Sequence, residues 1–445
     1  MDEGSFRGPI HLVGHHVELE PLSVEHAADL ARALRDPEVS RLLRNPPGRT
    51  PDELAEWIRR LLARQAEGRT VALAIRLRPT GPTVGTTQFQ PVDPSSGVVE
   101  IGGTFLDSAY WGTPVNPETK RLMLGHAFEV AGAHRVQLQT DLRNVRSQRA
   151  IERLGAVREA TLREDVLLPD GTYRSSVYYS VLAPEWPGVR HRLDTALQRP
   201  RAPRPPVGST APPPVVPPVS SPVGAPVSGL PPTSFREAGV LRGRWVELVP
   251  LTRDHLSDLV VAGADPAIWE YMRIRHGDTP EGMRRLVDDL LSEQERGGVL
   301  PFTVRIGDPP RAVGIIRYLD IRRPDRGVEV GTWLASSVWR TPVNTEAKYL
   351  LLRHAFESER VHRVQIKADR RNARSLRAIR RLGAVAEGAM REHYRFEWGG
   401  YRTSEYHSLL DFEWPAVRAR LEAALARPYD HPVRPPAPGT RDAGG

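Results

Sequence analysis

The chain has 445 residues, of which 40% are apolar and 26% charged, and it carries a formal net charge of +8. This length is too great for one ordinary hydrophobic core and favours two domains of about 200 residues. Cysteine is absent and no run of about 20 apolar residues occurs, which excludes disulfides, thiolate metal sites and a cysteine nucleophile, and predicts no membrane-spanning helix.

The positive charge comes mainly from arginines that are spread through nearly every segment rather than gathered in one patch. A basic protein associated with nucleic acid is therefore kept only as an alternative, and we do not expect nucleic-acid binding to be the main function. The N-terminus shows no charged-then-apolar signal pattern, and with the lack of cysteine this predicts a cytoplasmic protein. The histidines show no metal-ligand spacing, so no metal site is expected.

Apolar periodicity and turn residues predict the elements of the first half of the chain. Helices are expected at residues 24–34, 51–67, 116–131, 144–154 and 184–197. Strands are expected at residues 11–21, 71–77, 84–92, 98–106, 135–140, 157–168 and 173–182. The same order is predicted again from about residue 240 to residue 426, because the sequence repeats itself.

The repeat is visible in several exact or nearly exact segments. His-Arg-Val-Gln occurs at 134–137 and 362–365, and Glu-Trp-Pro at 185–187 and 413–415. A repeat this long indicates a duplicated domain and not a solenoid. The predicted organisation is a domain at 8–198, a Pro-rich disordered linker at 199–234, a second domain at 235–427 and a disordered tail at 428–445. Whether the two domains touch is left open by the sequence.

A turn that leads from a predicted strand into a predicted helix also occurs twice. It reads Trp-Gly-Thr-Pro-Val-Asn at 111–116 and Trp-Arg-Thr-Pro-Val-Asn at 339–344. The first amides of a helix have no partner within the helix, so a turn of this kind suits a bound phosphate.

The order of elements, with this turn between the fourth strand and the third helix, resembles the GNAT superfamily of acyl-CoA N-acyltransferases, and most closely the branch of the ribosomal-protein N-terminal acetyltransferases. The resemblance rests on ordered motifs present in both copies: Glu100-Ile-Gly and Glu329-Val-Gly, the two turns, Asn144-x-x-Ser147 and Asn372-x-x-Ser375, and Leu-Gly-Ala at 154–156 and 382–384. It implies an α+β fold, with two tandem domains that each have a mostly antiparallel sheet flanked by helices.

The resemblance further implies acetyl-CoA as co-substrate. The implied contacts are Trp111, Gly112, Thr113, Val115, Asn116 and Asn144 in the first copy, and Trp339, Arg340, Thr341, Val343, Asn344, Thr345 and Asn372 in the second. The first family glycine is proline in both copies, at Pro114 and Pro342, and Pro117 removes another amide from the first. We therefore expect the second copy, which has Thr345 and Arg340, to be the more competent cofactor site.

Four residues inherit catalytic roles from the resemblance. Glu100 and Glu329 match the carboxylate that acts as base, and a glutamate at a strand end in solvent or in a structural ion pair is the competing interpretation. Ser147 and Ser375 match a serine near the thioester, which can hydrogen-bond the developing thiolate. The competing interpretation is helix capping alone, with Asn144 and Asn372 as N-caps.

The predicted function is transfer of an acetyl group from acetyl-CoA to a primary amine, either a protein N-terminus or a small molecule, by direct attack in a ternary complex. The alternative is a non-catalytic acyl-CoA-binding or scaffold protein in which at least one domain is degenerate. The acceptor pocket is expected to be formed by the first two helices, their connecting loop and the loop before the last strand, which are the segments in which the copies differ most. The sequence does not identify the acceptor.

Overall fold

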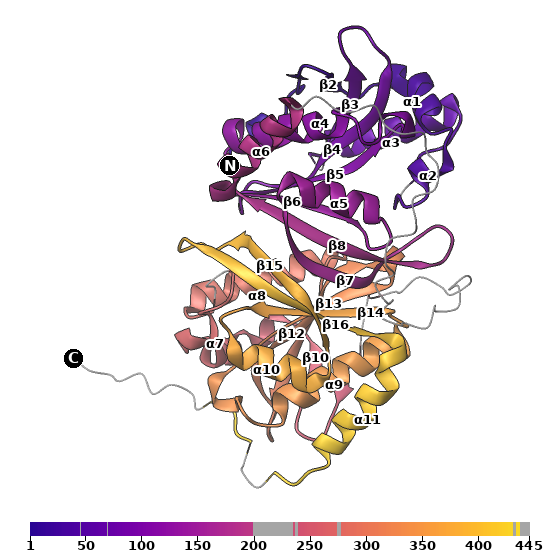
Figure 1. Ribbon diagram of the computed structural model, residues 1–445. Helices are drawn as coiled ribbons and strands as arrows, with labels where there is room; N and C mark the ends of the chain where they lie inside the picture. Colours follow the sequence, from indigo (N-terminus) through magenta and orange to yellow (C-terminus); the bar gives the residue numbers. More distant parts are fainter. Residues whose placement is uncertain are drawn as a thin grey trace, which may run out of the picture. The chain divides into compact units, whose positions relative to one another are not determined.

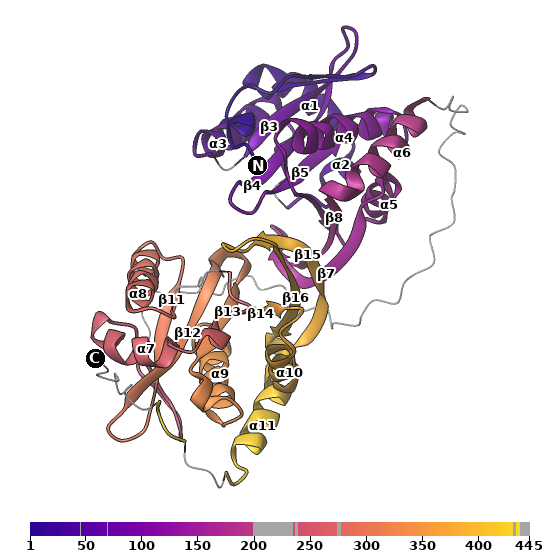
Figure 2. The same ribbon diagram turned by 90° about the vertical axis from the view of Figure 1, so that its left-hand side faces the viewer.

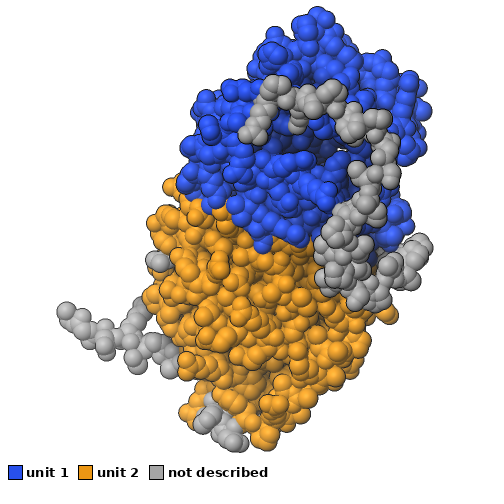
Figure 3. Space-filling view, viewed as in Figure 1, with its two compact units in different colours: residues 1–159, 166–230 blue, residues 160–165, 231–445 orange. Residues whose placement is uncertain are grey.

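The computed structural model describes residues 1–44, 46–68, 70–198, 235, 239–273, 277–429 and 433–436. It divides into two compact units, residues 1–159 with 166–230 and residues 160–165 with 231–445 (Figure 3). The predicted linker at 199–234 lies outside the described residues, as does most of the predicted tail at 428–445. Below, the first copy means the elements from β1 to α6, and the second copy the elements from β9 to α11.

The first copy alternates helices with an eight-stranded order β1-β2-β3-β4-β5-β6-β8-β7 (Figure 1). Its elements are β1 (Leu12–Val13), β2 (Val17–Pro21), α1 (Ala27–Ala33), α2 (Pro37–Ser40), α3 (Pro51–Ala66), β3 (Val71–Leu77), β4 (Thr83–Asp93), β5 (Val98–Leu106), α4 (Val115–Gly125), β6 (Arg135–Asp141), α5 (Val145–Leu154), β7 (Val157–Leu167), β8 (Tyr173–Leu182) and α6 (Trp186–Gln198). The pair β5–β6 is parallel, whereas β1–β2, β2–β3, β3–β4, β4–β5 and β6–β8 are antiparallel.

The second copy repeats this topology with the strand order β9-β10-β11-β12-β13-β14-β16-β15. Its elements are β9 (Leu241–Arg242), β10 (Glu247–Pro250), α7 (Leu256–Gly263), α8 (Pro280–Glu295), β11 (Leu300–Ile306), β12 (Arg311–Arg322), β13 (Gly327–Leu334), α9 (Val343–Arg353), β14 (Arg363–Asp369), α10 (Ala373–Leu382), β15 (Val385–Arg395), β16 (Tyr401–Leu410) and α11 (Trp414–Leu425). In Figure 2, α7 and α8 lie on one side of this sheet and α9 and α11 on the other. The predicted α+β fold with two tandem domains is confirmed.

Local sequence explains where the longer helices begin. Thr50 caps α3 by accepting from the Glu53 amide, the Glu53 carboxylate accepts in return from the Thr50 amide, and Pro51 occupies the first turn. This reciprocal pairing satisfies two amides that a helix leaves open at its start. At the start of α8 the Thr279 hydroxyl accepts from the Gly282 amide and Pro280 occupies the first turn, without the return bond that Glu53 makes in α3.

The first predicted strand, residues 11–21, is in fact a hairpin of β1 and β2. Gly14 closes the turn, and the amides of His15, His16 and Val17 donate to the buried carboxylate of Glu118 at 2.9, 2.6 and 2.8 Å. Alternation of apolar residues continues across this turn, so the sequence pattern alone did not reveal it. Glu346 takes the same three amides from the hairpin of β9 and β10, at 2.7, 2.7 and 2.8 Å.

The core under the sheet determines which way the β5 side chains point. Val99 and Ile101 are buried in one cluster with Met123 and Leu124 of α4. Because successive side chains of a strand alternate between faces, Glu100 projects from the face of β5 that is turned away from α4. Glu329 projects from the corresponding face of β13, since its neighbours Val328 and Val330 are buried in the second core.

Candidate functional site

The turn between β5 and α4 is held by its own side chains. The Trp111 indole donates to the Leu106 carbonyl at 2.9 Å, and the Thr113 hydroxyl donates to the Tyr110 carbonyl at 2.7 Å. Gly112 lies at a φ of +76°, and Pro114 precedes the first residue of α4. The turn before α9 repeats these contacts: the Trp339 indole donates to the Leu334 carbonyl, and the Thr341 hydroxyl donates to the Val338 carbonyl. The repeated sequence therefore encodes one rigid turn, built twice.

The amides available at the two helix starts differ in number. The Val115 amide faces the Thr113 hydroxyl at 3.4 Å, the Glu118 amide donates to the Pro114 carbonyl, and Pro117 has no N–H. In the second copy Thr345 stands in place of Pro117 and supplies an N–H. Arg340 stands in place of Gly112, and its φ of +66° is one that L-residues rarely adopt. The second turn thus has one more amide and also a strained residue.

The start of α5 lies beside the same turn. The Asn144 side chain accepts from the Ser147 amide at 3.0 Å, which is an N-cap, and Asn372 caps α10 through Ser375 identically. The Arg146 guanidinium stacks on the Trp111 ring, and Arg374 stacks on Trp339. Capping uses only the backbone amides of the two serines. Among the described residues, neither serine hydroxyl has a hydrogen-bond partner, and both side chains are partly exposed.

Strands β5 and β6 separate just beyond Glu100. Their parallel pairing covers Val98 to Glu100 against Arg135 to Gln137, although β5 continues to Leu106 and β6 to Asp141. Beyond Glu100, β6 therefore makes no backbone hydrogen bonds to the edge of β5 that faces it. An extended ligand that carries amides can pair with this edge. The second copy separates at the same place, after Glu329 and Gln365.

Glu100 lies where the two strands separate and is held by neutral groups. The Gln137 and Gln139 amides each donate to its carboxylate at 2.8 Å, and the residue is only 4% exposed. Burial raises the pKa of Glu100, against the opposing effect of the two glutamines and, more weakly, of Arg174 and Arg135. Arg135 itself is bonded to Glu159 and Gln137. A carboxyl group with a raised pKa is a better proton acceptor than an exposed glutamate.

Glu329 has a charged neighbour in place of the second glutamine. Gln365 donates to its carboxylate at 3.0 Å, as Gln137 does to Glu100, but the other partner is the Lys367 ammonium at 2.9 Å. Lys367 also donates to the Tyr394 hydroxyl at 3.2 Å. Burial alone would lower the pKa of Lys367. Glu329, Tyr406 and Tyr394 outweigh this effect and hold the pKa well above the ordinary lysine value. Glu329 is therefore part of a buried ion pair.

Sequence reasoning did not predict the residues that distinguish the two glutamates. Gln137 and Gln365 belong to the repeated His-Arg-Val-Gln segment, and two residues later the copies differ, with Gln139 in one and Lys367 in the other. Alternation along a strand places those residues on the same face, and this was a usable signal. Lys120 was also missed; it is buried on α4 with its ammonium nitrogen 2.7 Å from the Thr104 hydroxyl.

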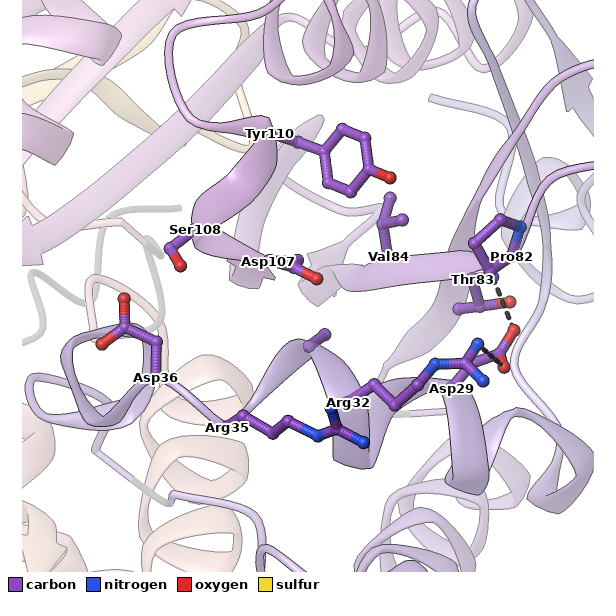
Figure 4. A pocket seen from close by; sticks show the side chains of 11 residues that line it. Asp29, Arg32, Arg35, Asp36, Pro82, Thr83, Val84, Asp107, Ser108 and Tyr110 are labelled. Atoms are coloured by element: carbon purple, nitrogen blue, oxygen red, sulfur yellow. Dashed lines mark hydrogen bonds and ion pairs between the residues drawn. The ribbon is translucent and has the colours of Figure 1, made fainter. Parts of the chain in front are cut away.

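Two hollows of the first copy lie near the turn and not at Glu100. One, of about 420 Å³, is lined by α1, the start of β4 and the short helix η3 (Ser108–Tyr110). Figure 4 shows Asp29 with Arg32 at one end of it and Asp36 with Ser108 at the other. The second, of about 600 Å³, is lined by the β1–β2 turn, Arg78, and residues 113–115 at the start of α4. Only the second adjoins the helix amides, so the first is not assigned to the reaction.

Metal-ligand clusters and membrane-spanning helices are both absent from the residues that the structure describes. No group of three or more histidine, aspartate or glutamate side chains in this part of the chain is arranged to hold a metal ion. No helix in it combines the length and the apolar character that a membrane crossing requires.

Comparison with known proteins decides the family. The model of the acetyltransferase (GNAT) domain matches residues 16–157 and again residues 246–385, together more than half of the chain. The chain belongs to the GNAT acetyltransferase family. The predicted resemblance and the tandem duplication are both confirmed, and a GNAT chain of this kind is an acyltransferase. Members of the family take their acyl group from acetyl-CoA.

The relatives of this GNAT protein each correspond to about one copy. A structure from T. thermophilus, described as a candidate acetyltransferase, is 44% identical and covers 43% of this chain and 98% of its own, with a TM-score of 0.39. The uncharacterized N-acetyltransferase p20 of Bacillus licheniformis is 23% identical over 153 residues, 34% of this chain and 85% of that protein. Mycobacterium smegmatis RimJ, solved with CoA-disulfide, is 21% identical over 42% of this chain and 93% of its own, with a TM-score of 0.37.

Proposed function

We propose that this GNAT protein transfers an acetyl group from acetyl-CoA to a primary amine, a protein N-terminus or a small-molecule amine, by direct attack in a ternary complex. The observation that carries the proposal is the position of the glutamate at the separation of β5 and β6. Glu100 is buried, its carboxylate is held by two glutamine amides, and it adjoins the unpaired stretch of β5. A base and a place for an extended donor thus lie side by side.

The donor would use the turn and the strand separation together. We assign its phosphates to the start of α4 or α9 and its amide-bearing arm to the unpaired edge of β5 or β13. Asn144 and Asn372 cap their helices beside the turns, and we assign them to the same arm. The assigned contacts are Trp111, Gly112, Thr113, Val115 and Asn116 in one copy and Trp339, Arg340, Thr341, Val343, Asn344 and Thr345 in the other.

The reaction needs two proton transfers. An acceptor arrives mainly as its ammonium ion and gives one proton to the glutamate carboxylate, directly or through water. The free amine then attacks the thioester carbonyl carbon, so that the C–N bond forms and the C–S bond breaks. The nitrogen's second proton passes to the departing thiolate, and the glutamate later returns its proton to solvent. The products are an N-acetyl amide, free CoA thiol and one proton.

Ser147 and Ser375 are assigned to the departing sulfur. Their hydroxyls are not used by the helix caps, and their helices begin beside the turns to which the donor is assigned. A serine hydroxyl is a weak acid, so its role is to donate a hydrogen bond to the developing thiolate rather than to supply the proton outright.

The test is release of CoA thiol by the full chain from acetyl-CoA and a panel of amines that includes N-terminal peptides and small diamines. We expect turnover with at least one class, and loss of turnover in the double variant E100Q/E329Q. Glu3→Gln is the matched control, because Glu3 is exposed and lies outside the segments assigned to the donor and the acceptor. Tight binding of acetyl-CoA without thiol release from any amine would contradict the proposal.

A further inference from the structure

The two copies surround their glutamates with different charges. On the face of the sheet that carries Glu100, the neighbouring strands place Gln88 and Gln90 of β4 and Gln137 and Gln139 of β6. The equivalent positions in the second copy are Arg317 and Leu319 of β12 and Gln365 and Lys367 of β14. Two of four neutral amides are thus replaced by cations. The correspondence follows from register, because Gln88 pairs with Gly102 as Arg317 pairs with Gly331, and Gln139 pairs with Tyr178 as Lys367 pairs with Tyr406.

A base must have a free lone pair that can take a proton. Glu100 has no ammonium or guanidinium within ion-pair distance among the described residues; Arg135 is engaged by Glu159, and Arg174 acts only at longer range. Glu329 shares its carboxylate with the Lys367 ammonium at 2.9 Å, and Arg317 adds a further positive charge on the same side of the sheet. The Glu329 carboxylate is thus occupied by a cation at the position where the Glu100 carboxylate meets only neutral amides.

The charges also affect the approach of the acceptor. An amine reaches either site mainly as an ammonium ion. The site at Glu100 offers one carboxyl group among amides, which attracts a cation. At Glu329 the carboxylate is already paired with the Lys367 ammonium, and Arg317 and Asp320 add charges of opposite sign within electrostatic range. A carboxylate that is already paired attracts a second cation less strongly than the unpaired Glu100 does.

The strand that carries the glutamate differs as well. β5 has one residue more than β13 at this point, Gly102-Gly103-Thr104 against Gly331-Thr332. The extra residue forms a bulge opposite Thr87, with Gly103 at a φ of +57°, whereas β12 and β13 pair without interruption from Gly314 to Leu319. A bulge leaves a backbone group outside the ladder. The ladder beside Glu100 is therefore interrupted at a place where the ladder beside Glu329 is continuous.

We infer that acetyl transfer takes place at the first copy with Glu100 as the base, and that the second copy, whose glutamate is neutralised by Lys367, does not carry the chemical step. The inference rests on the proposed function and divides it between the copies. It is independent of donor binding, for which the additional Thr345 amide and Arg340 favour the second turn. The copy with the better phosphate turn is then not the copy with the better base.

The experiment compares single variants of the full chain with an amine that the wild type acetylates. We expect E100Q to lower kcat/KM by about 10²- to 10⁴-fold, the usual range for loss of a general base, and E329Q to change it less than about threefold. The exchange variants are Gln139→Lys, which places an ammonium beside Glu100, and Lys367→Gln. The first should lower kcat/KM and remove the rise of rate with pH that Glu100 produces. The second, made in the E100Q background, should raise the residual kcat/KM, because it releases Glu329 from its ion pair.

Thermal melting and acetyl-CoA binding of each variant separate loss of the base from loss of folding. Turnover that survives E100Q and disappears in E329Q would overturn the inference and leave the proposed function intact. Equal losses in both single variants would overturn it too, since they would show that both copies react. A wild-type chain that releases no thiol with any amine would overturn the proposed function, and this inference with it.

Discussion

The guanidinium carbon of Arg146 lies 3.2 Å from the centre of the Trp111 ring, and Arg374 lies at the same distance from Trp339. In each copy this stack joins the first turn of one helix to the turn that precedes another. The Trp111 indole is at the same time bonded to the Leu106 carbonyl at the end of β5. One side chain therefore connects the strand end, the turn and α5, which are the three parts assigned to the donor.

Removing the stack should weaken donor binding more than it affects the chemical step. A cation–π pair contributes about 0.5 to 2 kcal/mol, so Arg146→Ala should raise the KM for acetyl-CoA roughly 2- to 30-fold with kcat little changed. Steady-state kinetics on the full chain measures both constants. Arg374→Ala is the matched control in the second copy and should leave them unchanged. A fall in melting temperature with an unaltered KM would show that the stack only stabilises the fold.

The carboxylate of Glu118 is the main link between α4 and the β1–β2 hairpin. It accepts three consecutive amides while only 5% exposed, so Glu118→Gln replaces a charged acceptor by a group that also presents a donor to those amides. We expect a loss of about 2 to 4 kcal/mol, or roughly 4 to 16 °C in the melting transition of the first copy. Calorimetry of the full chain measures it. Glu25→Gln should leave the transition in place, and Glu346→Gln should lower that of the second copy instead.

Gly112 and Arg340 occupy equivalent positions with φ of +76° and +66°. An added Cβ at Gly112 would meet no atom within 4 Å, so Gly112→Ala tests the backbone alone and should cost about 1 kcal/mol. Arg340→Gly should instead stabilise the second copy by about 0.5 to 1 kcal/mol. If Arg340 binds a donor phosphate, the same variant lowers acetyl-CoA affinity, which calorimetric titration detects. Higher stability with unchanged affinity would contradict that role.

The features that were predicted correctly from the sequence are those determined by residues close together in the chain. The turn, the two asparagine N-caps and the order of strands and helices depend on local patterns, which the duplication presents twice. The β1–β2 hairpin was missed because the residue that holds its turn, Glu118, lies about 100 positions away in the chain. Its alternating apolar residues read as one strand, and only the distant carboxylate shows where that strand folds back.

The unequal surroundings of the two glutamates could be predicted only in part. The exchange of Gln139 for Lys367 is visible in the aligned repeats. The effect of this exchange on the glutamate can be seen only from two facts of the structure. One is the parallel register that places Gln137 beside Glu100, and the other is the point where β5 and β6 separate. Parallel strands are joined through a distant crossover, so neither fact is contained in the local sequence. The single extra glycine at residues 102–103 was not read as a bulge, because a bulge is defined by the register of β5 against β4 and not by the β5 sequence alone.

Lys120 provides a prediction that concerns pH and stability. Its ammonium nitrogen lies 2.7 Å from the Thr104 hydroxyl and 3.4 Å from the Thr87 hydroxyl, and the described part of the chain gives it no carboxylate partner. Burial lowers the pKa of Lys120 to about 7. In the unfolded chain the pKa returns to about 10.4, so between these values the unfolded state binds more protons than the folded state and stability rises with pH.

The cost of the buried charge is therefore complete below pH 7 and disappears toward pH 10. Lys120→Met removes the ionisable group, so the variant should be the more stable protein at pH 6, and its advantage should be roughly 2 to 3 kcal/mol smaller at pH 9. Denaturant unfolding gives the free energy of unfolding of wild type and variant at both pH values. The variant's advantage at pH 6 is then compared with its advantage at pH 9, and the contributions of other titrating groups cancel in this comparison. Lys348→Met is the control, since burial lowers the pKa of Lys348 only to about 8 and its pH-dependent change should be smaller. An advantage for Lys120→Met that is constant from pH 6 to pH 9 would show that Lys120 does not titrate in this range.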